Sequence, residues 1–429
     1  MKYKLEVLLV ILICANVLLF LLWNSKVVWT LERCITTTTK KIIKQYAESI
    51  SKSHDLSGNS YSRNNHGNGS FSTTLVNNPN NLTVELVASR LAILWTNGYI
   101  FNSCTKSKRI YYAKPPKTGS TTLRWVLYSF ALRNKLKICT DAVHWFHMNF
   151  PYKIDPETVM GTEHGCDIIA DELIFDMKVL EKFAGMKSSD HVKFLTSVRE
   201  PIRHFLSVYN HANVPNFAGL STTQRYRLFF LQPKLNRLYT LLSRTGGDHR
   251  AINTFLRPNL QLHSLGIPEY TWSNHQVLLT AIFEKLKQMQ FAVMSDHFDE
   301  SMVILKRIFC WSDEEVMYME LNQKRHTTHN ALPEDVIKSI ANYTKGDRLL
   351  FEVANMTLWK IIEKVPHFET ELSSHRRKLR EYKSLCKSEK HKSYECMGTG
   401  NLGKIRFDIH NASKRYLNEK LKELIKKLR

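Results

Sequence analysis

Short apolar runs in this chain alternate with stretches whose apolar residues recur at helical spacing. Residues 109–113, RIYYA, predict a strand, and the turn residues that follow lead into a predicted helix from Thr121. Residues 191–198 predict a second strand, and residues 202–211 predict a second helix after the turn Arg199-Glu200-Pro201. The chain therefore contains two strand–loop–helix units.

Other segments extend the same alternation. Residues 166–170 predict a third strand, and residues 299–309, 313–321 and 353–364 predict helices. Strands that alternate with helices are typical of a parallel sheet, because each crossover needs a connecting element. The predicted fold class is α/β, with a central parallel sheet flanked by helices.

The N-terminus begins with an apolar run from Val7 to Trp23 that contains only Asn16 as a polar residue. Seventeen residues are at the short end of the range for a membrane span. A cleaved signal peptide is the alternative, but no small-x-small cleavage site follows closely. We interpret residues 7–23 as an uncleaved signal-anchor helix, with residues 1–6 cytosolic and the remainder lumenal.

Composition divides the lumenal part into three predicted regions. Residues 27–85 are rich in Asn, Ser and Gly and are interpreted as a flexible stem, because such a sequence cannot bury a core. Residues 90–370 form the predicted globular domain. Residues 371–429 form a basic, helical extension, which either packs on the domain as a solvated helix or contacts a membrane surface.

Charge and cysteine content narrow the possible partners. The net charge of +22 favours an anionic partner, and a lumenal location argues against nucleic acid. The six cysteines from Cys104 onward, an even number, predict disulfides in an oxidising lumen, although their pairing, including a short Cys386–Cys396 loop, stays open. Five sequons predict N-glycosylation at Asn68, Asn81, Asn342, Asn355 and Asn411.

The first strand–loop–helix unit carries an anion-binding pattern in residues 117–122, KTGSTT. Amides at a helix N-terminus attract anions, Gly119 allows close approach, and Lys117 adds a mobile charge. The sequence is not a Walker A loop, because the lysine precedes the glycine. A plain turn, with Ser120 and Thr121 as helix caps, is the structural alternative. The candidate ligands are Lys117, Thr118, Gly119, Ser120, Thr121 and Thr122.

The second unit adds a fixed cation and a hydroxyl. Arg199 ends the second strand, and Ser207 lies eight residues later in the next helix. A guanidinium binds phosphate through two parallel donors, although Arg199 could instead serve a structural ion pair. Two anion sites on one sheet edge would suit a ligand with phosphates at both ends.

These two motifs together resemble the sulfotransferases that use 3′-phosphoadenylyl sulfate (PAPS). Residues 298–322, with FDESMVILK, CW and LN, and residues 355–359, NMTLW, resemble the galactose 3-O-sulfotransferase family more specifically. The resemblance implies a sulfotransferase fold, PAPS as co-substrate and a glycan or glycolipid acceptor. It also implies that Lys117 and its loop bind the 5′-phosphosulfate, that Arg199 and Ser207 bind the 3′-phosphate, and that the protein is a single-pass type II Golgi membrane protein.

The chain departs from that family at two positions where relatives carry histidine. Pro116 precedes Lys117, and Glu172 follows the third strand. We therefore predict that Glu172 is the catalytic base, with a solvated loop carboxylate as the alternative. Other candidate bases are Asp171, His144 and His147, and the two histidines alone are too few to bind zinc. No metal is predicted, because side-chain cations supply the positive charge.

Several other functions remain possible from the sequence. A glycosaminoglycan sulfotransferase would suit the net charge of +22. A protein that keeps the PAPS cleft but has lost catalysis would suit the missing histidines. A lumenal kinase is disfavoured by the absence of a Walker A motif. The sequence does not fix the exact acceptor or the oligomeric state.

Overall fold

The computed structural model describes residues 82–96, 105–141, 148–160, 165–183, 192–211, 221–231, 256–320 and 332–387. The predicted anchor at 7–23 lies outside these ranges, as do Asn68, Asn81, Asn411, His144 and His147. Within the described ranges, no helix is both long enough and apolar enough to cross a membrane. The anchor and its type II topology therefore stay predictions.

The chain divides into two compact units. Within Met1–Leu75 and Pro215–Gln232, which form the first unit, the structure describes only residues 221–231, with helix α7 (Thr222–Leu231). All other described residues belong to the second unit. The candidate site lies entirely in this second unit.

A four-stranded parallel sheet organises the second unit. Its order is β4-β1-β5-β6, with strands β4 (Ile168–Ile169), β1 (Ile110–Ala113), β5 (Lys193–Val198) and β6 (Phe291–Met294). All residues of β1 and β6 are buried, as expected for parallel strands covered on both faces. The parallel sheet predicted from the sequence is confirmed.

The register brings three loops to one edge of this sheet. Ala113 pairs with Thr196, and Val198 pairs with Met294, so β1, β5 and β6 end near one another. The chain crosses from β1 to β4 on one side and then returns to β5 on the other. Ligands in open α/β sheets bind at such a switch point, outside the carboxyl ends of the strands.

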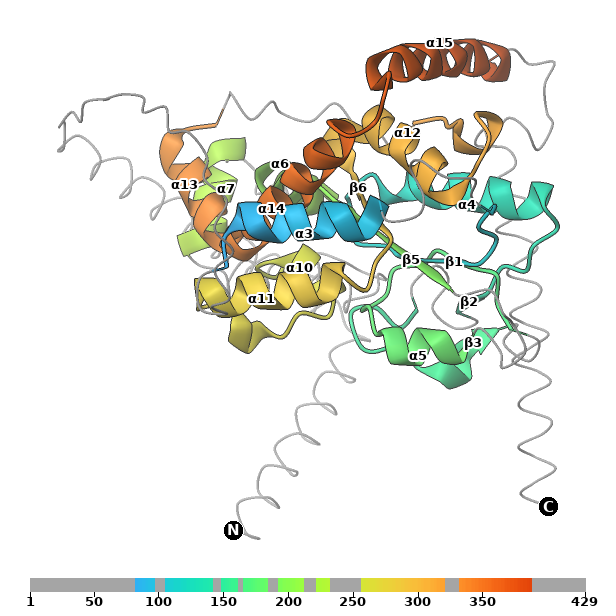
Figure 1. Cartoon of the computed structure of the whole chain (residues 1–429). Helices are drawn as coiled ribbons and strands as arrows, with labels where there is room; N and C mark the ends of the chain where they lie inside the picture. Colours follow the sequence, from blue (N-terminus) through green and yellow to red (C-terminus); the bar gives the residue numbers. More distant parts are fainter. Residues whose placement is uncertain are drawn as a thin grey trace, which may run out of the picture. The chain divides into compact units, whose positions relative to one another are not determined.

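Helices cover the sheet and connect its strands. Helix α4 (Ser120–Arg133) follows β1, α6 (Pro201–His211) follows β5, and α12 (Phe298–Phe309) follows β6, as the apolar periodicity predicts. Helix α14 (Lys345–Ile362) packs against β5 and β6, and α3 (Val84–Thr96) packs along α14 (Figure 1). The other α-helices among the described residues of this unit are α5 (Met177–Lys182), α10 (Leu260–Ser264), α11 (His275–Leu286), α13 (Glu334–Tyr343) and α15 (Phe368–Lys387).

One predicted helix is wrong. Residues 313–321 were expected to be helical, but only the 3-10 turn η5 (Glu314–Val316) forms, and residues 317–320 are not helical. Glu315 accepts a hydrogen bond from Lys106 (2.8 Å), and Tyr318 is 7% exposed with its hydroxyl bonded to an aspartate of α12. These tertiary contacts override the local helical spacing.

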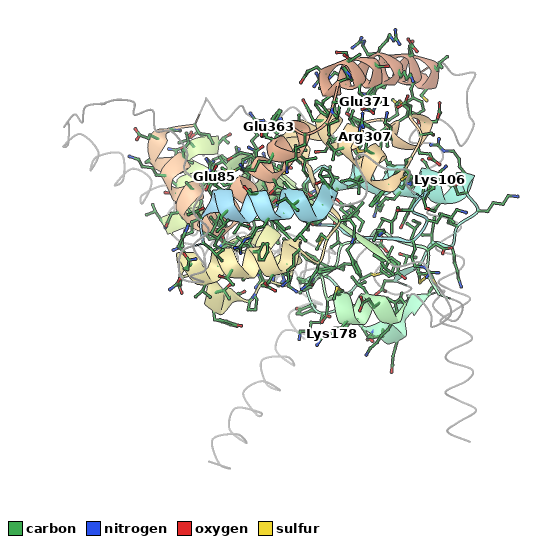
Figure 2. The ribbon with its side chains drawn as sticks, viewed as in Figure 1. Glu85, Lys106, Lys178, Arg307, Glu363 and Glu371 are labelled. Carbon is green, nitrogen blue, oxygen red and sulfur yellow. A yellow bond between two sulfur atoms is a disulfide. The ribbon has the colours of Figure 1, made fainter. Side chains whose placement is uncertain are left out.

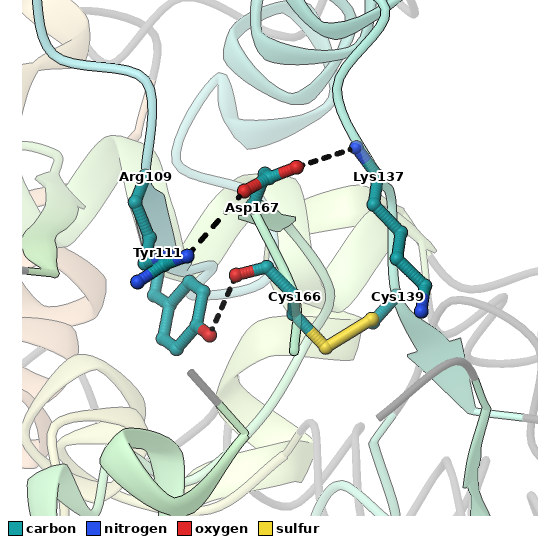
Figure 3. The surroundings of a disulfide bond; sticks show 6 residues. All are labelled: Arg109, Tyr111, Lys137, Cys139, Cys166 and Asp167. Atoms are coloured by element: carbon teal, nitrogen blue, oxygen red, sulfur yellow. Dashed lines mark hydrogen bonds and ion pairs between the residues drawn. A yellow bond between two sulfur atoms is a disulfide. The ribbon is translucent and has the colours of Figure 1, made fainter. Parts of the chain in front are cut away.

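A disulfide fixes the short strand β4 (Figure 3). Cys139 and Cys166 are joined, and both side chains are buried. The carbonyl of Cys166 accepts a hydrogen bond from the Tyr111 hydroxyl (3.0 Å), and Asp167 accepts one from the Lys137 amide (2.9 Å). Cys310 and Cys386 each take part in a disulfide bond as well. The prediction of disulfides is thus confirmed, whereas a bond to Cys396 lies outside the described residues.

Helix α15 is attached to α12 by ion pairs. Arg307 pairs with Glu371 (2.6 Å) (Figure 2). Lys306 also pairs with Glu371 (2.6 Å), and Arg376 pairs with Asp299 (3.0 Å). Leu372 and Leu379 of α15 belong to the hydrophobic core. The domain boundary predicted between residues 370 and 371 therefore falls inside a helix that packs on the domain.

Candidate functional site

The loop after β1 has all of its backbone carbonyls occupied from residue 115 to residue 119. Donors come from the loop itself, from α6, from the end of β5 and from the turn after β6. The pairs are Thr118 Oγ1 to Pro115 (2.9 Å), His204 Nε2 to Pro116 (2.9 Å), Arg199 Nη1 to Lys117 (2.9 Å), the Ser295 hydroxyl to Thr118, and the Thr122 amide to Gly119 (3.0 Å).

The backbone amides of the same loop differ from its carbonyls in their hydrogen bonding. Within the described part of the chain, the amides of Thr118, Gly119, Ser120 and Thr121 form no hydrogen bond. Buried or half-buried amides almost always have a partner, so a row of unpaired amides at a helix N-terminus indicates an anion site. This observation supports the phosphate-loop interpretation of the sequence.

The backbone conformation of the loop explains why glycine occurs in it. Gly119 is the N-cap of α4 and has a φ of 70°, in the left-handed region. A Cβ atom at this position would lie 3.3 Å from the Ser295 hydroxyl oxygen. The cap is therefore backbone only, and the alternative that Ser120 or Thr121 caps the helix is wrong.

A chain of hydrogen-bonded hydroxyl groups connects the loop to strands β1 and β5. The Tyr112 hydroxyl lies 2.5 Å from the Ser197 oxygen, which lies 2.6 Å from the Thr118 oxygen. Because the Pro115 carbonyl can only accept, Thr118 donates to it, Ser197 donates to Thr118, and Tyr112 donates to Ser197. The chain joins β1, β5 and the loop in one fixed orientation.

Arg199 connects the two predicted motifs directly. Its guanidinium donates to the Lys117 carbonyl, and it forms no ion pair within the described ranges, so the alternative of a structural salt bridge is not supported. The side chain of Gln261 holds the Arg199 backbone through two hydrogen bonds, of 2.8 Å and 3.0 Å. Burial lowers the pKa of Arg199, with Asp296 opposing that shift. Ser207 lies two turns into α6 and is 4% exposed.

Glu172 is buried rather than solvated. It is 8% exposed, and its Oε1 atom lies 2.5 Å from Nζ of Lys114, which is 3% exposed. Lys114 stands between β1 and the loop, so the pair links Glu172 to the base of the loop. Burial lowers the pKa of Lys114, and the charge of Glu172 opposes that shift. The alternative of a solvated loop carboxylate is wrong.

Asp171 has a different environment. It is fully buried and accepts hydrogen bonds from Thr140 (2.5 Å) and Tyr128 (3.3 Å), with Arg124 at 3.9 Å. These contacts favour a structural role for Asp171 and leave Glu172 as the stronger candidate base.

Four residues of this site carry no motif that identifies them in the sequence: Lys114, Ser197, His204 and Ser295. Only their contacts across the sheet edge identify them, although Lys114 and Ser197 lie next to the two motifs in sequence. Across the described ranges, no group of three His, Cys, Asp or Glu residues is placed to hold a metal ion.

Comparison with known proteins agrees with this geometry. The sequence model of galactose-3-O-sulfotransferases matches residues 1–401 of this chain. The chain belongs to the galactose-3-O-sulfotransferase family. Human galactosylceramide sulfotransferase is 24% identical over 276 residues, which cover 63% of this chain and 62% of the relative. Mouse galactose-3-O-sulfotransferase 3 is 25% identical over 266 residues, which cover 59% and 57%. Each alignment spans less than two thirds of the relative's own length.

In this member of the family, the FDESMVILK block lies directly beside the loop. Phe298, its first residue, would be 3.9 Å from a Cβ atom at Gly119, and its ring contacts Tyr318 edge-on with 4.8 Å between the ring centroids.

The two sequons within the described residues differ in exposure. Asn342 is exposed on α13, whereas Asn355 is half-buried within α14. The structure thus favours Asn342 over Asn355 as an accessible glycan site.

Proposed function

We propose that this protein transfers a sulfuryl group from PAPS to a sugar hydroxyl, with position 3 of a galactose in a glycolipid or glycoprotein glycan as the acceptor. The unpaired amides of residues 118–121 beside Lys117 carry the proposal, because they form a site for the phosphosulfate end of the donor. Arg199 and Ser207 would hold the 3′-phosphate. The family relationship supports the acceptor class.

PAPS supplies the sulfuryl group and leaves as adenosine 3′,5′-bisphosphate (PAP). In the reaction, the acceptor oxygen forms a bond to sulfur while the bond between sulfur and the bridging phosphate oxygen breaks. The electron pair of that bond stays on the phosphate. Lys117 and the loop amides would stabilise this negative charge, since fixed donors aimed at developing charge lower the barrier.

The acceptor hydroxyl must lose a proton during the transfer, and Glu172 is the proposed base. Its carboxylate takes that proton, and Nζ of Lys114, 2.5 Å from Oε1, holds the carboxyl group in position before the reaction. A general base contributes roughly 10²–10⁴-fold to such a step. No metal ion has a role in this proposal.

The cellular setting is part of the same proposal. An anchor at residues 7–23 would place the described domain in the Golgi lumen, where the Cys139–Cys166 bond would be stable. The family relationship supports this setting. The membrane, through that anchor, and the glycan or glycolipid acceptor would be the partners.

The test uses the full chain purified in detergent, with radiolabelled PAPS and a panel of galactosides, galactolipids and glycosaminoglycans. We expect sulfate transfer to galactosides or galactolipids. Transfer only to glycosaminoglycans would assign the other subclass, and PAP binding without transfer to any acceptor would identify an inactive PAPS-binding protein.

Three variants test the assigned roles. Lys117→Ala and Arg199→Ala should each weaken PAP binding roughly 10- to 100-fold, because each removes a charged hydrogen bond. Glu172→Gln should reduce turnover roughly 10²-fold or more while PAP binding is unchanged. Lys178→Ala, on the exposed side of α5, is the matched control and should behave as wild type. Wild-type PAP affinity in both loop variants would refute the site.

A further inference from the structure

The side chains that hold the loop carbonyls come from three separate elements. His204 lies on α6, Arg199 lies after β5, and Ser295 lies after β6, and they bond three successive carbonyls at residues 116, 117 and 118. Arg199 already has a proposed role toward the 3′-phosphate. The other two have no role in the reaction described above.

The geometry of the peptide unit gives these contacts a consequence. The carbonyl of one residue and the amide of the next belong to one planar trans unit and point in opposite directions. Holding the carbonyls of Pro116, Lys117 and Thr118 therefore fixes the directions of the amides of Lys117, Thr118 and Gly119, of which the last two belong to the unpaired amides described above. If a carbonyl were released, its peptide unit could rotate and present an oxygen to the anion.

His204 is suited to act as a neutral donor. It is 2% exposed, and because a carbonyl only accepts, its Nε2 atom must carry the hydrogen. Burial, and then the neighbouring charges of Arg199 and Lys117, lower the pKa of His204 to about 3. The imidazole is therefore neutral at pH 7 and carries no positive charge that could pair with an anion.

Ser295 reaches the loop from the turn after β6. Its hydroxyl donates to the Thr118 carbonyl and lies where a Cβ atom at Gly119 would be 3.3 Å away. The turn that carries Ser295 is tied to the second motif, because Asp296 accepts hydrogen bonds from the Glu200 amide (2.8 Å) and from Arg203 (3.1 Å). The segments that carry Arg199, His204 and Ser295 are thus joined to one another at the sheet edge.

We propose that His204 and Ser295 are positioning residues, which lock the carbonyls of Pro116 and Thr118 outward so that the loop amides face the phosphosulfate end of the donor. The proposal rests on the proposed function, because it assigns that end of PAPS to this loop. It predicts that these residues affect recognition of the 5′-phosphate and not of the 3′-phosphate.

The experiment compares two probes on the full-length protein in detergent by calorimetry. PAP carries both phosphates, whereas 3′-AMP lacks the 5′-phosphate. His204→Leu and Ser295→Ala should each lower PAP affinity about tenfold, the value of one lost hydrogen bond at a charged site, and leave 3′-AMP affinity within about twofold. His204→Gln should restore PAP affinity, because the Gln Nε2 group can donate in place of the imidazole Nε2.

Matched controls separate positioning from a general loss of stability. His375→Leu removes another buried imidazole, on α15, and Thr357→Val removes a buried hydroxyl that donates within α14. Both controls should keep the wild-type ratio of PAP to 3′-AMP affinity. If His204→Leu does not fold, Ser295→Ala and His204→Gln decide the question, because Ser295 is only half-buried.

The outcomes distinguish the two proposals. If the wild-type protein binds PAP no more tightly than 3′-AMP, the loop does not hold the 5′-phosphate and the proposed function fails. If wild-type protein shows the preference but folded His204→Leu and Ser295→Ala keep it unchanged, the positioning role is refuted. Equal loss of both affinities in these variants would also refute it, since that pattern indicates a general structural role.

Discussion

At the scale of single residues, the Lys114–Glu172 pair is the feature most open to test. Lys114→Met removes the ammonium that lies 2.5 Å from the proposed base. Breaking a buried ion pair by removing one partner costs about 3–5 kcal/mol of stability. The change should also move the acid limb of the activity profile to higher pH, because the proposed base loses the opposite charge beside it.

This prediction is measured by chemical denaturation and by turnover against pH. The double variant Lys114→Met/Glu172→Gln should recover part of the stability lost in the single variant, since it leaves no buried charge from this pair. A single variant whose pH profile matches wild type would argue against Glu172 as the base.

Site residues that belong to a sequence motif could be predicted from the sequence. Site residues whose role depends on contacts with distant parts of the chain could not. Lys117 and Arg199 stand at fixed offsets from turn residues, which made both visible. His204 and Ser295 contact the loop across 88 and 177 positions of sequence. Nothing in the local spacing of either residue indicates a loop carbonyl as its partner.

At the scale of elements, helices α10 and α14 hold each other's N-termini. Asn259 Oδ1 accepts from the amides of Gly346 (2.9 Å) and Asp347 (3.1 Å), and Asp347 accepts from the amides of Gln261 (3.2 Å) and Leu262 (2.9 Å). A Cβ atom at Gly346 would lie 2.6 Å from the end of the Leu262 side chain and 3.0 Å from the Asn259 side chain, so a larger residue would force these side chains to move. The same Gln261 side chain holds the Arg199 backbone, which links this helix pair to the site.

The buried carboxyl group at this junction predicts a pH dependence of stability. Burial raises the pKa of Asp347 to about 7, against the effect of the amides of Leu262 and Gln261. The folded protein therefore holds this proton more tightly than the unfolded chain does. Its contribution to stability is full below about pH 4, the ordinary range of the group, and is lost as the pH rises through about 7.

Asp347→Asn should remove this component, because the amide does not titrate. The shift corresponds to a change on the order of 4 kcal/mol between pH 4 and pH 8. Urea unfolding of both proteins across that range measures it, and the wild-type curve should fall relative to that of the variant. Parallel curves would show that folding does not raise the pKa of Asp347.

Elements were predictable where one face of a periodic segment determines its packing. β1, β5, α6 and α12 follow from apolar spacing and turn residues and lie within two residues of their expected limits, and α4 begins one residue before its expected start. β6 was not predicted, because a run of four apolar residues fits a strand or a buried helix equally well. The 313–321 segment failed because its side chains have partners on other elements.

At the scale of the whole molecule, the site is assembled from segments that one disulfide helps to hold. Loops after β1, β5 and β6 meet at one sheet edge, and Glu172 reaches that edge from the end of β4. β4 has only the residues Ile168–Ile169, so its few ladder hydrogen bonds fix it weakly. The Cys139–Cys166 bond anchors the chain immediately before it.

Removing this bond should affect both stability and catalysis. Cys139→Ala/Cys166→Ala opens a loop with a sequence separation of 27 residues. Closing a loop of that size stabilises a protein by about 3–4 kcal/mol, so the free energy of unfolding should fall by that amount. Turnover should fall more than PAP affinity. Glu172 follows Cys166 on the segment that loses its anchor, whereas the donor loop follows β1 on a different segment. Denaturation curves and calorimetry with PAP measure the two effects, and a variant whose turnover and PAP affinity fall by the same factor would contradict a specific link between this bond and the base.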